Sequence, residues 1–269
     1  MPKYVIKRNK KKEKFDPQKI IKTLENLKLN QEKIAYILRE IEKSLPEVVT
    51  TKELFKFVYD LLKKEKESLA YKFNLKQALT RLGPSGYPFE KFISHLLRLY
   101  GYNTKHNVFL EGKCLTYEID FLAEKDVVYL GECKYHFSLN KKNDIKTILY
   151  SYARFLDIRE NFKKEIKLWL VTNTRFTFEG IKFASCYDIK LLSWDYPKDE
   201  SLKFLIENKK VYPLTIFDFL SNKILQNLFQ YDIVLLSDFL EKDENYLKKI
   251  SGLKIEDIIS LKNKIRDII

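Results

Sequence analysis

The sequence has 269 residues, of which 45% are hydrophobic and 14% aromatic, enough for one large domain or two to three small ones. It contains no apolar run near the ~20 residues that a membrane span needs. The charged start is followed by no apolar stretch of the kind that a secretory signal has, so we expect a cytoplasmic protein without a membrane segment. Its three cysteines, Cys114, Cys133 and Cys186, are odd in number, which argues against a disulfide framework, and they stand in no metal-ligand spacing, which argues against a zinc site.

The charge balance indicates an anionic partner. Fifty Lys and Arg residues against 37 Asp and Glu residues give a formal net charge of +13. A surplus of this size attracts polyanions such as nucleic acids through counterion release. A compositional bias towards Lys, Ile, Phe and Tyr explains the same numbers, so charge by itself does not establish nucleic-acid binding.

The first segment is expected to be mostly helical. A short strand is expected over residues 3–8, and Asp16 followed by Pro17 predicts the beginning of a helix, because these are a capping residue and a first-turn proline. Further amphipathic helices are expected over 31–44, 51–65 and 66–81. The run "LGPSGYP", with two Gly and two Pro in seven residues, then predicts a domain boundary.

The middle segment changes to a mixed pattern. A helix beginning after Pro88 is expected to end at Gly101, and strands are expected at "KHNVFLE", "LTYEIDFLA" and "VVYLGECKYHF". A helix over 143–158, a strand at "IKLWLVTN", a helix over 177–186 and a strand at "IKLLSWDYP" follow. This order predicts an α/β (α+β) fold with a mixed sheet flanked by helices.

The last segment is expected to be helical, with two helices hinged at Gly252 in "YLKKISGLKIEDIISLKNKIRDI". This stretch is similar to half of a helix-hairpin-helix, whose turn presents backbone N–H groups to DNA phosphates. Plain helical packing or dimerisation is the other interpretation. We therefore expect three domains, over residues 1–84, 85–198 and 199–269.

Two acidic residues are expected to face each other in the middle segment. If strands 116–123 and 127–137 pair about Asp126, then Asp120 lies opposite Glu132 on one face, and Lys134 lies one step further along it. Carboxylates this close repel unless a cation lies between them, and hard oxygen ligands select Mg²⁺ or Mn²⁺. An ordinary solvated hairpin face remains the other interpretation of this spacing.

The opposite face of the second strand is expected to be apolar and to pack inward. It carries Gly131, Cys133, Tyr135 and Phe137. On this basis Cys133 is predicted to be a packing residue rather than a nucleophile.

The order of the acidic residues and the lysine resembles the PD-(D/E)xK nucleases, which have the restriction-endonuclease-like fold, and within them the Mrr-like group. The matching residues are Glu90 in "GYPFEKFISHLLRLYGY", Asp120 in "YEIDFLA", and Glu132 and Lys134 in "GECKYH". The downstream "WLVTNTRFTFEGIKFASCYDIKLLSWDYP" also looks like the strand and helix that follow the Mrr-like site. The resemblance covers about residues 86–197.

This resemblance implies a role for each matching residue. Asp120 and Glu132 would be metal ligands together with the backbone carbonyl of Cys133, and Lys134 would be the catalytic lysine. Glu90 would make an additional, water-mediated metal contact. Two further residues on the same strand faces are weaker candidates for a role in the site. Glu118 would assist Asp120, and His136 would contact phosphate.

A second candidate site lies near the N-terminus, in "VIKRNKKKEKFDPQKI". Its cations precede a helix N-terminus, which suits a phosphate chain, although a solvated basic arm that touches DNA fits equally well. Residues 3–83 as a whole resemble an ATP-cone, a small regulatory domain that binds ATP or dATP. By position, the resemblance implies nucleotide contacts from five residues: Lys7, Arg8, Glu13, Lys19 and Thr51.

One residue of the ATP-cone pattern is missing. The usual Gly of the turn after Lys-Arg is absent, and Lys10 or Lys11 stands near its position. No P-loop motif occurs in the sequence, so we expect the adenine nucleotide to act as a regulator rather than as a fuel.

Together these resemblances predict a Mg²⁺- or Mn²⁺-dependent endodeoxyribonuclease regulated by ATP or dATP. We expect DNA as the partner and a homodimer for duplex cleavage, since each active site cuts one strand. The alternatives are a nucleotide-responsive regulator that binds DNA without cutting it and a nuclease that acts on RNA.

Overall fold

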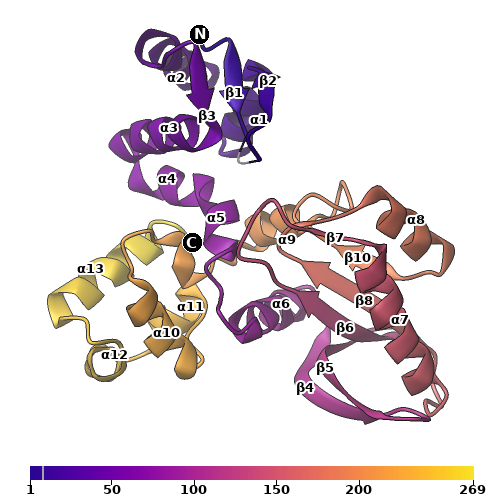
Figure 1. The fold of residues 1–269 in the computed structure, drawn as a ribbon. Coiled ribbons are helices and arrows are strands. Elements are labelled where there is room, and N and C mark those ends of the chain that lie inside the picture. Colours follow the sequence, from indigo (N-terminus) through magenta and orange to yellow (C-terminus); the bar gives the residue numbers. More distant parts are fainter. Residues whose placement is uncertain (8) are drawn as a thin grey trace. The chain divides into compact units, whose positions relative to one another are not determined.

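The structure is a computed structural model that describes residues 1–7 and 9–269. It has a mixed α/β fold with two compact units, one comprising Met1–Leu75 and the other comprising Lys76–Asp267 and Ile269 (Figure 1). The boundaries expected at 84/85 and 198/199 remain predictions. No helix in the described part of the chain is long and apolar enough to cross a membrane.

The N-terminal unit combines a small sheet with helices. Its strands, in the order β2-β1-β3, are β1 (Tyr4–Ile6), β2 (Lys12–Lys14) and β3 (Val48–Thr50). Its helices are α1 (Pro17–Asn26), α2 (Gln31–Ser44), α3 (Thr51–Glu65) and α4 (Glu67–Phe73). Strand β1 is antiparallel to β2 and parallel to β3, so the chain leaves the sheet through α1 and α2 before it returns.

Local sequence signals account for most of these helix ends. The Asp16 side chain accepts a hydrogen bond from the backbone of Gln18, and Pro17 begins α1, as expected. Thr50 and Glu53 form a reciprocal capping box at the beginning of α3. The single helix expected over 66–81 is wrong: α4 ends at Phe73, and Asn74 separates it from a second short helix that begins at Leu75.

The second unit contains the central five-stranded sheet. The sheet has the order β10-β8-β6-β5-β4 and consists of β4 (Asn103–Glu111), β5 (Thr116–Glu124), β6 (Val128–Lys134), β8 (Ile166–Thr172) and β10 (Lys190–Leu192). A separate pair is formed by β7 (Lys142–Asn143) and β9 (Arg175–Phe176). The helices around these strands are α6 (Tyr87–Leu99), α7 (Ile145–Arg159) and α8 (Phe178–Cys186). Helix α5 (Leu75–Leu79) begins at the last residue of Met1–Leu75.

Both directions of pairing occur in this sheet, as a mixed sheet requires. Strand β5 is antiparallel to β4 and β6, whereas β8 is parallel to β6 and β10. Helix α6 packs against β4 and β5, and α7 packs against β8 on the other side of the sheet (Figure 1). The core beneath α7 is formed by Ile148, Phe155 and Ile158 with the apolar side chains of β6 and β8.

The remainder of the second unit is helical. It comprises α9 (Leu202–Lys209), a 3₁₀ turn (Leu214–Ile216), α10 (Asn222–Gln230), α11 (Leu236–Glu241), α12 (Glu244–Ser251) and α13 (Ile255–Arg266). The predicted hinge is confirmed, because Gly252 ends α12 with a φ of 76°. The Arg81 guanidinium donates hydrogen bonds to the carbonyls of Thr215, Phe217 and Leu220, which ties the segment before α6 to these helices.

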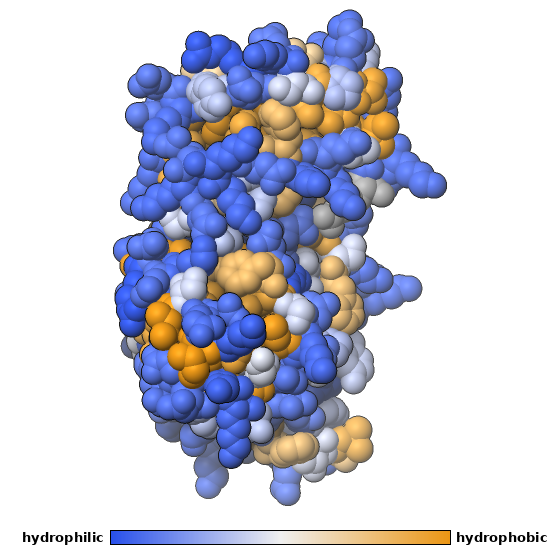
Figure 2. Space-filling model, turned by 90° about the vertical axis from the view of Figure 1, so that its left-hand side faces the viewer, coloured by the Kyte–Doolittle hydropathy of each residue, from blue (hydrophilic) through white to orange (hydrophobic). Residues whose placement is uncertain are grey.

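The face of the molecule in Figure 2 is predominantly hydrophilic, with apolar side chains gathered in limited patches.

Candidate active site

The site begins where strands β5 and β6 separate. Their pairing is centred on Asp126, as predicted, and its last pair is Phe121 with Gly131. Gly131 is required there, because a Cβ atom at this position would lie 2.2 Å from the Phe121 ring. The predicted pairing of Asp120 with Glu132 lies one step beyond the end of the ladder, where the strands have already parted.

Asp120 occupies the gap between the parted strands. Its Oδ2 accepts a hydrogen bond of 2.6 Å from the backbone N–H of Cys133. Burial and the charge of Glu132 raise the pKa of Asp120 to about 6, despite the opposing effect of this hydrogen bond. The side chain therefore bonds to the backbone of β6 as a strand partner would.

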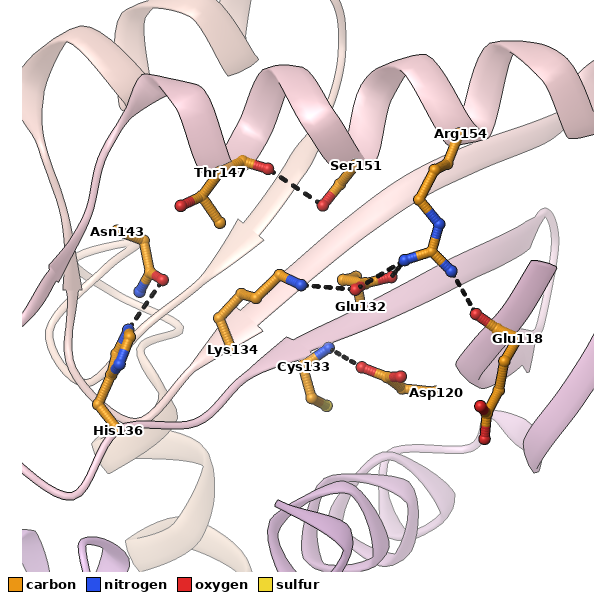
Figure 3. A network of polar contacts seen from close by, with 10 residues as sticks. All are labelled: Glu118, Asp120, Glu132, Cys133, Lys134, His136, Asn143, Thr147, Ser151 and Arg154. Carbon is orange, nitrogen blue, oxygen red and sulfur yellow. Dashed lines mark hydrogen bonds and ion pairs between the residues drawn. The ribbon is translucent and has the colours of Figure 1, made fainter. Parts of the chain in front are cut away.

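Glu132 is a buried carboxylate held by two cations. Lys134 Nζ lies 2.6 Å from its Oε1, and one guanidinium nitrogen of Arg154 in α7 lies 3.1 Å from each of its oxygens. A second guanidinium nitrogen of Arg154 donates to the backbone carbonyl of Glu118. In Figure 3, Lys134 and Arg154 approach Glu132 from opposite sides. Because a buried unpaired charge is costly, these partners explain how Glu132 is tolerated at 7% exposure.

Glu90 lies in the first turn of α6 and joins the acidic group. Burial and then the charges of Asp120, Glu118 and Glu132 raise the pKa of Glu90 to about 7. The structure thus brings together Glu90, Asp120 and Glu132 from three elements, as their order in the sequence predicts. Glu118 is exposed, and its charge contributes to this cluster.

A polar network holds the backbone just after the site. Thr172 donates to the carbonyl of Lys134 at 2.6 Å and accepts from the Asn143 side chain at 2.9 Å. Asn143 also contacts the ring of His136 at 2.9 Å. His136 is therefore engaged within the protein, and its proposed contact with phosphate remains a prediction.

The inward orientation predicted for Phe137 is wrong. Strand β6 ends at Lys134, and the backbone of His136 bonds to the Asn173 side chain instead of to a neighbouring strand. Regular alternation therefore stops, and Phe137 is 65% exposed. Cys133 is buried as predicted, and burial raises the pKa of its thiol well above the ordinary value, which disfavours a thiolate.

Arg154 is the residue of the site that sequence reasoning missed. It occupies the inward stripe of α7, three residues after buried Ser151 and four before buried Ile158. A cation at such a position requires a buried anion nearby, and that requirement was the available signal.

The N-terminal unit assembles part of the predicted nucleotide site. Lys7 Nζ lies 3.4 Å from Glu13 Oε2, and the Thr51 hydroxyl donates to the carbonyl of Ile6. Lys19 is exposed on α1, and no hydrogen bond or ion pair joins its side chain to these three residues. Arg8 lies outside the described residues.

The turn between β1 and β2 keeps a glycine-like backbone without glycine. Lys10 has a φ of 64°, in the left-handed region that Gly favours, and its N–H donates to the carbonyl of Lys7. A lysine with a left-handed backbone conformation therefore stands near the position of the missing Gly.

A metal ion would have to be held by the acidic cluster. Among residues 1–7 and 9–269, no three Asp, Glu, His or Cys side chains already surround one point as metal ligands would. The donors nevertheless suit a hard divalent cation, since Glu90 and Asp120 are carboxylates whose pKa values are raised first by burial and then by neighbouring negative charge.

Known proteins resemble both parts of the chain. Residues 3–75 match the family model of the ATP cone domain. An uncharacterized protein from Archaeoglobus fulgidus is 35% identical over 176 residues, which is 64% of this chain and 99% of that protein. The chain belongs to the same family as this Archaeoglobus protein.

Two solved structures resemble the fold. AF1548, a protein of unknown function, has 34% sequence identity and a TM-score of 0.58 over 68% of this chain and 97% of its own. A more distant likeness is the MspJI restriction endonuclease in complex with a 27-mer oligonucleotide, with 14% identity and a TM-score of 0.36 over 71% of this chain and 39% of that one.

The raised pKa of Glu90 predicts that the difference in free energy of unfolding between wild type and Glu90→Gln depends on pH. Protonated Glu90 stabilises the folded protein, and this contribution is present below about pH 4.5 and lost as the pH rises through about 7. We expect Glu90→Gln to raise the free energy of unfolding by about 1 kcal/mol at pH 8 and by almost nothing at pH 4, allowing for screening by water. Urea denaturation without metal at pH 4 and pH 8 would measure these free energies, with the exposed Glu111→Gln as control. An equal effect of Glu90→Gln on the free energy of unfolding at both pH values would contradict the prediction.

The contacts of Arg154 predict a cost for its removal. Arg154→Met should lower the free energy of unfolding by about 1–3 kcal/mol, because Glu132 loses two charge-assisted hydrogen bonds while remaining buried. Arg159→Met on the same helix is the matched control, since that residue is exposed. Urea denaturation of both variants is the measurement, and equal losses would show that Arg154 contributes no more than a surface arginine.

Proposed function

We propose that the protein is a metal-dependent endodeoxyribonuclease of the PD-(D/E)xK type, with Mrr-like sequence features, and that its N-terminal ATP-cone binds a regulatory adenine nucleotide. The observation that carries this proposal is the convergence of Glu90, Asp120 and Glu132 from α6, β5 and β6, with Lys134 beside Glu132. Their order along the chain is the one found in that nuclease group.

Asp120, Glu132 and the backbone carbonyl of Cys133 would hold Mg²⁺ or Mn²⁺, and Glu90 would contact the ion through water. The N–H of Cys133 already points at Asp120, and in an extended strand the carbonyl of the same residue points to the same side. When bound, such an ion would supply positive charge at the phosphoryl oxygens under attack.

The residues of the chain would orient and stabilise the reacting phosphodiester. The Lys134 ammonium would leave Glu132 for the phosphate as negative charge develops on its oxygens. Arg154 would retain Glu132 in its buried position during this exchange, because its guanidinium bonds to both oxygens and to the backbone of β5. Water would then be the nucleophile, and one P–O bond of the DNA backbone would break.

A second candidate function is a DNA-binding regulator that does not cut. It is favoured by the arrangement of Glu132, whose oxygens are engaged by Lys134 and Arg154. Both functions use DNA as partner, and the net charge of +13 supports a polyanion in either case. A homodimer is expected if duplex DNA is cleaved on both strands.

Cleavage assays separate these functions. Plasmid, branched and methylated DNA should be nicked with Mg²⁺ or Mn²⁺, and Lys134→Ala should lower the rate by about 10²–10³-fold, as for other groups that stabilise transition-state charge. Exposed Lys142→Ala is the matched control. The nuclease proposal would be falsified, and the regulator favoured, if wild-type protein and Lys134→Ala both bind DNA and neither nicks it with Mg²⁺ or Mn²⁺. The same assay with an RNA substrate tests the third alternative, a nuclease that acts on RNA.

Nucleotide binding is tested by thermal unfolding. ATP or dATP at 100 times its dissociation constant should stabilise the protein by about 2.7 kcal/mol. Lys7→Ala should weaken this stabilisation, whereas Lys3→Ala, which also removes an exposed ion-paired lysine, should not. Cleavage rates with and without nucleotide then report regulation. If neither nucleotide shifts the unfolding temperature, the ATP-cone has only a structural role.

A further inference from the structure

Phe137 is an exposed aromatic residue that directly follows the candidate active site. It is three residues after Lys134, so the two Cα atoms lie within roughly 11 Å of each other. The backbone before it is fixed by Asn173, which accepts from the N–H of His136 at 2.9 Å and donates to its carbonyl at 2.8 Å. An exposed ring at this position lies on a segment that the core holds in place.

The ring of Phe137 is itself supported from behind. It meets the Tyr135 ring edge to face, with centroids 5.2 Å apart and planes at 77°. Tyr135 is anchored by a 2.6 Å hydrogen bond from its hydroxyl to the carbonyl of Thr80. A Cβ atom at Gly83 would lie 2.8 Å from the Phe137 ring and 2.8 Å from the Tyr135 hydroxyl, so the glycine backbone packs closely against both side chains. Phe137 is thus exposed to solvent and nevertheless backed by packed groups.

The two rings line a cleft of about 180 Å³. Its other walls come from the segment before α6 and from α10, and they include Pro84, Asn222 and Gln226. A cavity of about 150 Å³ can accommodate benzene, so there is room for one planar ring. The amide side chains of Asn222 and Gln226 offer hydrogen-bond donors and acceptors to the edge of such a ring.

We propose that Phe137 stacks against an unpaired nucleobase of the strand under attack, so that the preferred substrate is DNA with single-stranded or unstacked nucleotides at the cut. This inference rests on the proposed function, because it requires a DNA phosphate at Lys134, three residues before Phe137 along the chain. In a duplex the faces of the bases are covered by their neighbours, whereas a single strand offers them to an aromatic side chain.

The test measures DNA affinity without cleavage. Fluorescence anisotropy in EDTA compares a labelled single-stranded oligonucleotide with the duplex of the same sequence. Phe137→Ala should weaken single-strand binding about 5- to 150-fold and duplex binding by less than about twofold, which is the effect of losing one base–aromatic stack. Phe137→Trp should retain single-strand binding, and tryptophan fluorescence of this variant should be quenched by the single strand.

Two further variants separate stacking from packing. Phe137→Leu keeps an apolar side chain over Gly83 without an aromatic face, and it should behave like Phe137→Ala. Phe178→Ala removes another exposed ring, 76% accessible on α8 and outside this cleft, and it should leave single-strand affinity unchanged. The inference would be overturned if Phe137→Ala weakened binding of the single strand and of the duplex equally. It would also be overturned if Phe137→Ala changed the oligomeric state, because the ring would then contact a second copy of the chain.

The same variants distinguish this inference from the nuclease proposal. If cleavage depends on Lys134 but Phe137→Ala leaves the single-strand preference unchanged, the stacking inference alone fails. If the wild-type protein never cleaves DNA but the Phe137→Ala variant binds single strands more weakly than wild type does, the stacking inference stands and the nuclease proposal fails.

Discussion

The buried charge of Glu132 is the constraint on which the rest of the central sheet depends. A carboxylate in the middle of a packed sheet needs partners that compensate both its charge and its hydrogen-bonding capacity. Lys134 supplies one partner from the same strand, and Arg154 supplies the other from α7. The rotation of α7 follows from this requirement, because the stripe that carries Ile148, Phe155 and Ile158 into the core must also direct Arg154 at Glu132.

The separation of β5 and β6 has a related consequence on the other side of the site. Once the ladder ends at Phe121 and Gly131, the backbone of Cys133 needs a new acceptor, and the Asp120 carboxylate provides it. Burial and then the charge of Asp120 raise the pKa of Glu90, and burial and then the charge of Glu132 raise the pKa of Asp120. The site thus contains one carboxylate balanced by cations and two that are poorly balanced, an imbalance that a divalent cation would relieve.

The end of β6 shows how the same sheet positions groups beyond its last hydrogen-bonded pair. The Thr172 hydroxyl donates to the carbonyl of Lys134, and the Asn173 side chain bonds to the backbone of His136. The Asn143 side chain in turn donates to the Thr172 hydroxyl. The chain therefore leaves the sheet in a defined direction, and Phe137 is exposed at a fixed position. In the N-terminal unit, Lys10 similarly adopts a left-handed conformation that closes the β1–β2 turn without glycine.

Sequence reasoning predicted the mixed sheet flanked by helices, the register about Asp126, the helix end near Gly101 and the hinge at Gly252, because these depend on alternation, capping and glycine conformations within short stretches. The order along the chain also predicted that Glu90, Asp120, Glu132 and Lys134 lie near one another. The contact of Arg154 with Glu132 and the exposure of Phe137 could be known only from the tertiary structure. The Arg154 contact comes from a distant helix, and the exposure of Phe137 follows from the end of strand β6. Both depend on contacts between segments far apart in the chain, which local sequence patterns do not predict.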